Sequence, residues 1–115
     1  MPKKINPLGL NPLQLKTLAL LQELAQLPDH GTAESDGTVT VRYLPHPHGD
    51  HFHVGHHVVN GRDASGLTNR SVWAALDRKG LARPLDFPSA IVLTKAGRDY
   101  DTGDIGRAVL HSHSH

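Results

Sequence analysis

The chain has 115 residues, a length that suits a single domain with one hydrophobic core. It contains no cysteine, which excludes disulfides, thiolate metal sites and cysteine nucleophiles, so any metal would be held by histidine and carboxylate side chains. Twelve Lys and Arg residues against eleven Asp and Glu residues give a formal net charge of +1, which is too small to steer the whole molecule toward nucleic acid or an acidic membrane.

A helix is the first element that the sequence predicts. Asn11 suits the N-cap, Pro12 suits the first helical position, and Gln14 can return the hydrogen bond of a capping box. Leucines follow at the spacing of one buried helical face, and Pro28 ends the element. We expect residues 1–10 to be flexible. No apolar run reaches membrane-spanning length, so we expect a cytoplasmic protein without a membrane contact.

Two strands that form a hairpin are predicted next. Residues 39–43 alternate apolar and polar side chains, which is typical of a half-buried strand. A second strand is predicted over residues 51–58, and segment 44–50 between them is rich in turn residues. Because successive side chains of a strand point to opposite faces, one face of the second strand would carry His51, His53, Gly55 and His57.

A second helix is predicted from Thr68 to Lys79, with Thr68 as its N-cap. Its apolar residues recur at helical spacing and would face the core. Gly80 can adopt the left-handed conformation that ends a helix, and Leu81 can then pack back on Leu76.

The end of the domain is predicted to contain a strand and a short helical turn. Residues 90–93 are a short apolar run, and Thr94 can cap one last helical turn through Tyr100. The domain would therefore cover residues 11–101. We expect residues 102–115 to form a disordered tail.

The stretch from Asn69 to Tyr100, NRSVWAALDRKGLARP…PSAIVLTKAGRDY, resembles the second half of a winged-helix domain of small bacterial transcription regulators. The resemblance rests on a helix that ends in Gly-Leu before a hairpin wing, and on a Leu-Thr-x-x-Gly turn over residues 93–97. Together with the elements predicted from the residue pattern, it implies an α+β, winged-helix-like fold with a long N-terminal helix, a histidine-rich β-hairpin, a second helix and a short C-terminal wing hairpin. The chain departs from the family before the recognition helix, where only Gly61 to Leu67 remain for a further helix.

The resemblance implies that the helix after Thr68 reads double-stranded DNA in a transcription-regulator-like protein. The residues that would contact DNA are Asn69, Arg70, Ser71, Arg78, Arg83 and Lys95. The broad apolar face of the first helix also fits a homodimer. A continuous surface of Arg70, Arg78 and Arg83 would favour DNA. Interruption of that surface by Asp63, Asp77 and Asp86 would favour a protein-interaction domain with no DNA contact.

Histidine is the unusual feature of the composition, with ten residues, six of them between His46 and His57. One pattern there, H-x-H-x-D-H, is formed by His46, His48, Asp50 and His51. It is similar to the zinc signature of the metallo-β-lactamase superfamily. That superfamily needs a sandwich well beyond this length, so we do not assign the chain to it.

A second pattern, H-x-x-H-x-H in the segment HGDHFH, is similar to the repeated zinc-binding motif of streptococcal histidine-triad surface proteins. His51 and His53 would share a strand face and lie two residues apart at ~3.3 Å per residue, close enough to bind one ion. His48 would be the third ligand, and Asp50, His46 or water the fourth. Zinc or another late divalent metal is thus the one cofactor that the sequence favours.

Other interpretations of the histidines stay open. They can be polar residues on an exposed face, or a proton switch, because an unperturbed histidine titrates near pH 6.5. His111, His113 and His115 at the end of the chain can chelate metal by themselves. The sequence has no phosphate-binding glycine loop, nucleophile elbow or evident pair of catalytic carboxylates, so we do not expect an enzyme.

Overall fold

The computed structural model describes residues 6–45 and 51–110, so the predicted metal ligands His46, His48 and Asp50 lie outside the described residues. No helix of the described part is long and apolar enough to cross a membrane. The expected α+β layout is confirmed: an N-terminal helix is followed by antiparallel strands, further helices and a C-terminal hairpin.

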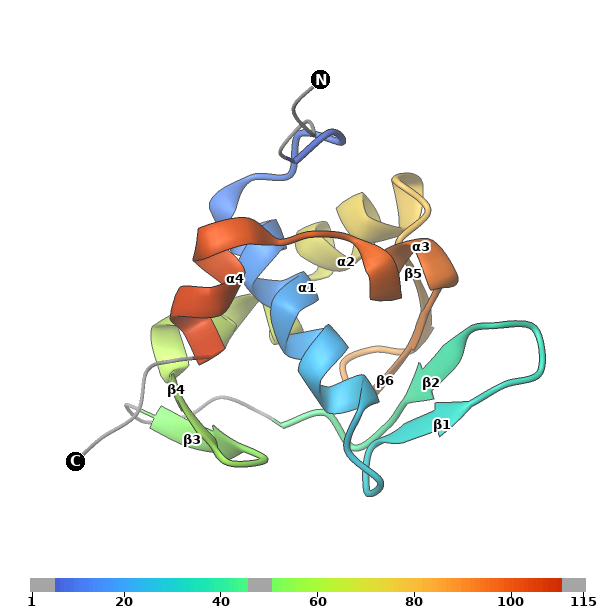
Figure 1. The fold of residues 1–115 in the computed structure, drawn as a ribbon, viewed down its shortest axis with the longest axis horizontal. Coiled ribbons are helices and arrows are strands. Elements are labelled where there is room, and N and C mark those ends of the chain that lie inside the picture. The colour runs from blue at the N-terminus through green and yellow to red at the C-terminus, as the bar shows by residue number, and fades with distance from the viewer. Residues whose placement is uncertain (1–5, 46–50, 111–115) are drawn as a thin grey trace.

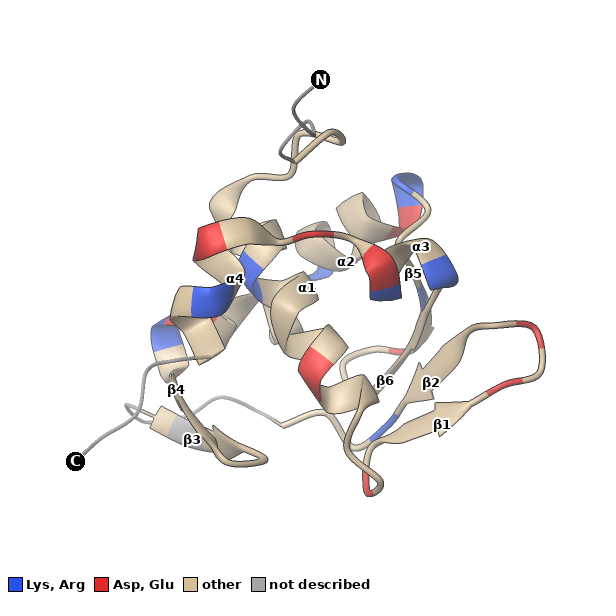
Figure 2. Cartoon of the chain, in the orientation of Figure 1, with Lys and Arg blue, Asp and Glu red and all other residues tan. Residues whose placement is uncertain are grey.

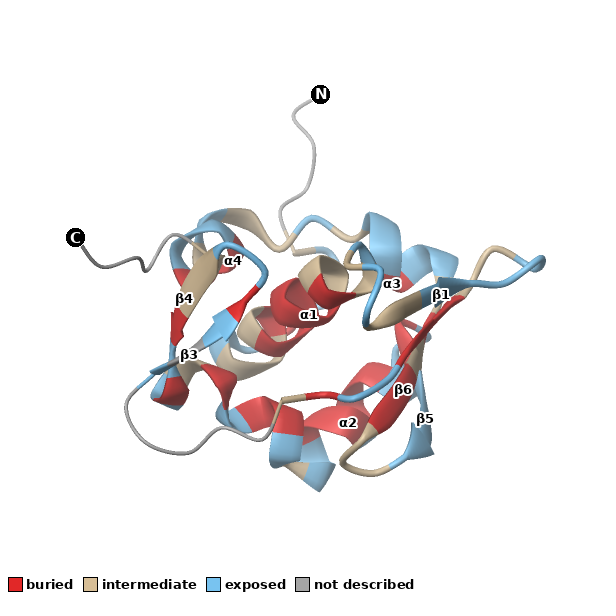
Figure 3. Ribbon diagram, turned by 90° about the horizontal axis from the view of Figure 1, so that it is seen from below, coloured by how far each residue is buried: buried red, intermediate tan, exposed pale blue. Residues whose placement is uncertain are grey.

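Helix α1 (Pro12–Ala25) is the centre of the molecule and begins at the capping box that the sequence predicts. Asn11 Oδ1 accepts a hydrogen bond from the Gln14 N–H at 2.8 Å, and Gln14 Oε1 accepts one from the Asn11 N–H at 3.0 Å. All leucines of the helix except the partly buried Leu13 are buried, and the helix contacts elements on several sides. Figures 1 and 3 show the β3–β4 hairpin and the four-stranded sheet on opposite sides of α1.

The sheet is antiparallel and has the strand order β1-β2-β6-β5. Its strands are β1 (Gly31–Ala33), β2 (Val39–Val41), β5 (Ala82–Asp86) and β6 (Ala90–Leu93). The sequence predicts the strands β2 and β6, and no strand is predicted over the segment of β1. The reason is that β1 is a short edge strand of small or polar residues, two of them exposed, and so lacks the apolar alternation by which strands are recognised.

The histidine-rich hairpin consists of β3 (His51–Val54) and β4 (His57–Asn60). The prediction of one strand over residues 51–58, paired with residues 39–43, is wrong. Gly55 has φ 59° and reverses the chain in a two-residue turn, a position that favours glycine. The hairpin therefore forms within residues 51–60, while β2 pairs with β1 and β6.

A 3₁₀ helix, η1 (Gly61–Thr68), follows the β3–β4 hairpin and packs closely on α1. A Cβ atom on Gly66 would lie 1.8 Å from Thr17 Oγ1, so only glycine permits this approach. Helix α2 (Arg70–Arg78) follows, and its N-cap is Asn69 instead of the predicted Thr68.

The C-terminal end of α2 agrees with the sequence prediction. Gly80 has φ 75°, and the Leu81 N–H donates to the carbonyl oxygen of Leu76 at 2.9 Å. This hydrogen bond spans five residues and is typical of helices that end at a left-handed glycine. The chain then enters the β5–β6 hairpin. Thr94 caps helix α3 (Lys95–Asp99), as predicted, because its Oγ1 accepts a hydrogen bond from the Gly97 N–H at 3.0 Å.

Both ends of the predicted domain extend further than the sequence suggests. Helix α4 (Gly103–Leu110) packs on α1 where a disordered tail is expected, and its Val109 is only 2% exposed. Leu10 is also buried, and Asn6 Oδ1 accepts a hydrogen bond from the Tyr100 hydroxyl at 2.6 Å. The apolar positions Ile105 and Val109 lie one helical turn apart and are the sequence signal for α4.

Candidate functional site

A groove lies between α2 and the β5–β6 hairpin and encloses about 290 Å³. Its lining residues are Arg70, Trp73, Ala74, Asp77, Pro84 and Phe87. The first four lie on α2 at positions i, i+3, i+4 and i+7, which is the spacing of one helix face. The hairpin supplies the other two and so forms the opposite wall. We call this feature the α2 groove.

Aromatic contacts fix the floor and one wall of the α2 groove. The rings of Trp73 and Phe87 are 4.8 Å apart between centroids and meet edge to face at 77°. Trp73 is only 2% exposed, and its Nε1–H donates to the carbonyl oxygen of Leu67 at 3.1 Å. The guanidinium carbon of Arg70 lies 4.3 Å from the Phe87 ring centroid, a cation–π contact. These contacts restrict the side chains before any ligand binds, which lowers the entropic cost of binding.

The structure distributes the six predicted DNA contacts over separate surfaces. Arg70 and Ser71 are exposed at the start of α2, and Arg78 is exposed at its end. Arg83 pairs with Val92 of β6. Val92 lies between the buried Ile91 and Leu93, so Arg83 and Val92 occupy the opposite face of the sheet from these two residues. The predicted cations therefore do not share one face.

Two of the six predicted contacts already have partners within the fold. Asn69 Oδ1 accepts hydrogen bonds from the N–H groups of Ser71 at 2.9 Å and Val72 at 3.3 Å. Lys95 Nζ lies 2.9 Å from Asp99 Oδ2, and this hydrogen bond, together with the charge of Lys95, lowers the pKa of the Asp99 carboxyl below its ordinary value. DNA contact by these residues stays a prediction.

Acidic residues alternate with basic ones along the described part of the chain, as the colours of the ribbon in Figure 2 show. Asp77 lines the α2 groove together with Arg70, and Asp86 lies on β5 three residues after Arg83. Asp63 is separate, because its Oδ1 forms an ion pair with a lysine of α1 at 2.9 Å. The mixed charge around the α2 groove is the pattern that favours a protein-interaction domain.

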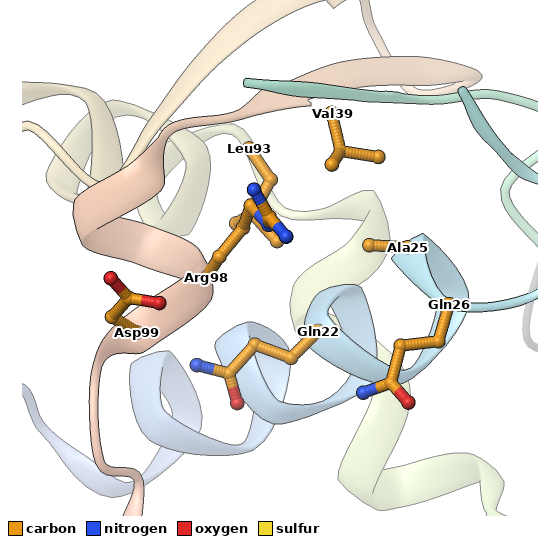
Figure 4. A pocket seen from close by; sticks show the side chains of 7 residues that line it. All are labelled: Gln22, Ala25, Gln26, Val39, Leu93, Arg98 and Asp99. Atoms are coloured by element: carbon orange, nitrogen blue, oxygen red, sulfur yellow. The ribbon is translucent and has the colours of Figure 1, made fainter. Parts of the chain in front are cut away.

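A second pocket of about 220 Å³ lies between α1, α3 and the sheet (Figure 4). Its lining residues are Gln22, Ala25, Gln26, Val39, Leu93, Arg98 and Asp99. Gln22 Nε2 donates to the carbonyl oxygens of Gly97 and Tyr100, each at 2.8 Å, and Arg98 Nη1 donates to that of Gly37 at 3.0 Å. Since these bonds hold α3 on α1 and on the β1–β2 connection, we assign this pocket a structural role.

The histidine hairpin brings together only part of the predicted metal site. His51 and His53 are exposed, and their ring centroids are 6.1 Å apart at an interplanar angle of 84°. His57 pairs with Val54, so it leaves the face of His51, and its Nε2 lies 3.6 Å from Glu23 Oε2 of α1. In the part of the chain that the structure describes, no three histidine or carboxylate side chains gather in a way that could hold a metal ion.

The sequence analysis does not identify Trp73, Ala74, Pro84 or Phe87 as site residues. The helical spacing of Arg70, Trp73, Ala74 and Asp77 could have identified the α2 wall. Phe87 could not be placed, because its position depends on the hairpin register.

Comparisons of the chain with family models, with curated proteins and with solved structures found no match.

Proposed function

We propose that this chain is a winged-helix-like protein-interaction domain and that its α2 groove receives an apolar side chain of a partner polypeptide. The observation that carries the proposal is the lining of the groove, in which the buried Trp73 and the Phe87 ring form an apolar floor and Arg70 is held over an aromatic face. Aromatic and arginine side chains are enriched at the centres of protein interfaces and contribute most of their binding energy.

Charge makes double-stranded DNA the weaker candidate for this surface. A DNA backbone presents phosphates of one sign only, so a DNA-binding face gains affinity from each cation and loses it from each carboxylate. Here Asp77 lies in the same groove as Arg70, and Arg83 is not among the residues that line it, because it alternates with the groove residue Pro84 along β5. A polypeptide can present both signs of charge, and it fits a groove that carries both.

A peptide-display selection against the full chain tests the proposal. Peptides that bind the wild type should contain an apolar anchor residue, because the groove floor is apolar. Ala74→Arg fills the exposed part of the groove and should weaken their binding at least ~10-fold. Ser71→Arg adds the same side chain at an exposed position of α2 outside the groove lining and should leave the affinity within ~2-fold of wild type.

The proposal is contradicted if no selected peptide is sensitive to Ala74→Arg. It is also contradicted if a random duplex DNA binds the same surface instead. In that case affinity would fall steeply with salt, and Arg70→Ala, Arg78→Ala and Arg83→Ala would each reduce the salt dependence.

A second candidate function, binding of zinc or another late divalent metal, is favoured by the geometry of His51 and His53. An imidazole nitrogen binds zinc at about 2.0–2.1 Å, which puts each ring centre about 3.2 Å from the ion. Two such rings on a tetrahedral ion have centres about 5 Å apart. The observed separation is 6.1 Å between exposed side chains, so a small rotation of either ring would bring both nitrogens to one ion.

Zinc titration followed by imidazole NMR tests this second function. The chain should carry alanine at His111, His113 and His115, which removes chelation by the terminal histidines. We expect saturable shifts at His51 and His53 that disappear in His51→Ala/His53→Ala. His56→Ala changes an exposed histidine of the same hairpin turn and should have no effect. Shifts that persist in the double variant would contradict the site.

A further inference from the structure

We infer that the partner segment of the α2 groove carries a carboxylate and a cation on either side of its apolar anchor, the carboxylate facing Arg70 and the cation facing Asp77. This inference rests on the proposed function and specifies the chemistry of the partner. It is carried by the placement of two opposite charges at the two ends of one groove.

The spacing of the two charges defines the partner's geometry. Arg70 and Asp77 are seven residues apart on α2, which corresponds to about 10.5 Å along the helix axis. Trp73 and Ala74 lie between them on the same face. A helical partner would match this distance with charges seven residues apart, and an extended partner with charges about three residues apart.

The two charges are not explained by the stability of α2. A helix has partial positive charge at its N-terminus and partial negative charge at its C-terminus, so cations are favoured at the end and anions at the start. Arg70 is the first residue of α2, and Asp77 lies in the last turn. Each placement opposes the helix dipole, which fits a role in binding better than a role in folding.

Neither charge is neutralised by another side chain of the described residues. The four ion pairs within residues 6–45 and 51–110 involve other groups, and the recorded contact of the Arg70 guanidinium is with the Phe87 ring. Both side chains are exposed at the groove. They are therefore positioned to pair with opposite charges on a ligand.

Single charge reversals in α2 test the inference. Their expected preferences are the same for either direction of the peptide in the groove, because the preferred peptides carry two equal charges. The probes are synthetic amphipathic helical peptides with one central leucine, which differ only in two flanking residues spaced seven positions apart. The flanking residues are Glu and Lys, two Glu, or two Lys. Wild type should prefer the Glu/Lys peptide by at least ~10-fold in fluorescence polarisation. Arg70→Glu should prefer two Lys, and Asp77→Lys should prefer two Glu.

The controls separate this inference from the proposed function. Ser71→Glu introduces a charge on α2 outside the groove lining and should keep the wild-type preference. The inference would be overturned, and the proposed function kept, if Ala74→Arg weakened peptide binding but the wild type bound all three charge patterns with equal affinity. Loss of all groove binding would overturn both. Asp77→Lys should fold with unchanged or raised stability, because the reversal complements the helix dipole. Arg70→Glu also complements the dipole but loses the cation–π contact with Phe87, so its stability should stay close to that of the wild type.

Discussion

The carbonyl oxygen of Leu81 lies 2.0 Å from the position that a Cβ atom on Gly97 would occupy. The backbone of α3 therefore touches the backbone at the end of α2. Thr94 completes the contact, since its N–H donates to the Leu81 carbonyl at 3.1 Å and its hydroxyl donates to the Gly80 carbonyl at 2.7 Å. The Gly-Leu motif and the Leu-Thr-x-x-Gly motif thus form one packing contact. Its two contacting residues, Leu81 and Gly97, are sixteen positions apart in sequence.

We predict that Gly97→Ala destabilises the fold by about 2 kcal/mol, because the added methyl group meets a backbone oxygen that cannot rotate away. Urea denaturation measures the change. Ala96→Ser is the matched control at an exposed position of the same short helix and should cost about 0.5 kcal/mol or less. A Gly97→Ala variant as stable as the control would show that α3 can move away from Leu81 without loss.

Asn69 is predicted to act on stability through its capping bonds to α2. Asn69→Ala removes an acceptor from two backbone N–H groups and should cost about 1 kcal/mol, whereas Asn69→Asp should retain most of the stability. Thr68→Ala, at the cap position that the sequence predicts, should change the free energy of unfolding by less than ~0.5 kcal/mol. If thermal denaturation showed a larger loss of stability for Thr68→Ala than for Asn69→Ala, Thr68 would be the N-cap.

Tyr43 has φ 58° and a side chain that is 75% exposed, so the chain holds a bulky residue in the left-handed region without burying it. This conformation costs about 1–2 kcal/mol for most residues, and asparagine tolerates it better. Tyr43→Asn should therefore stabilise the fold by about 0.5–1 kcal/mol. Arg42→Asn, at the exposed neighbouring residue, should give no such gain. A destabilised Tyr43→Asn variant would mean that the tyrosine ring makes a contact that outweighs the strain.

The predictable parts of the fold are those encoded by a few neighbouring residues. The capping box of α1, the glycine end of α2 and the Thr94 cap each depend on a local hydrogen-bond pattern, and all three are confirmed. Of the residues that line the α2 groove, Arg70 is predicted to bind DNA, on the winged-helix resemblance, and its contact with a partner polypeptide is a different role that the sequence does not predict.

The remaining features depend on contacts that are distant in sequence. Strand β1 is defined by its pairing with β2, and the turn at Gly55 matters only because it reverses the chain before β4. Phe87 reaches Trp73 because α2 packs on β5. The local sequence does not reveal these relationships, because the residues of β1, of the Gly55 turn and around Phe87 would also suit a loop.

Helix α4 provides the last prediction, because it was expected to be part of a disordered tail. A Cβ atom on Gly106 would lie 3.2 Å from the Ala19 Cβ of α1, and Val109 is buried beside it. Ending the chain after Asp101 exposes this face of α1 and should lower the free energy of unfolding by at least ~2 kcal/mol. Ending it after Leu110 removes only the terminal histidine segment and should leave thermal unfolding unchanged. If the two shortened chains unfold at the same temperature, α4 does not stabilise the domain and the folded unit ends at α3. If only the shorter chain is destabilised, α4 is part of the core.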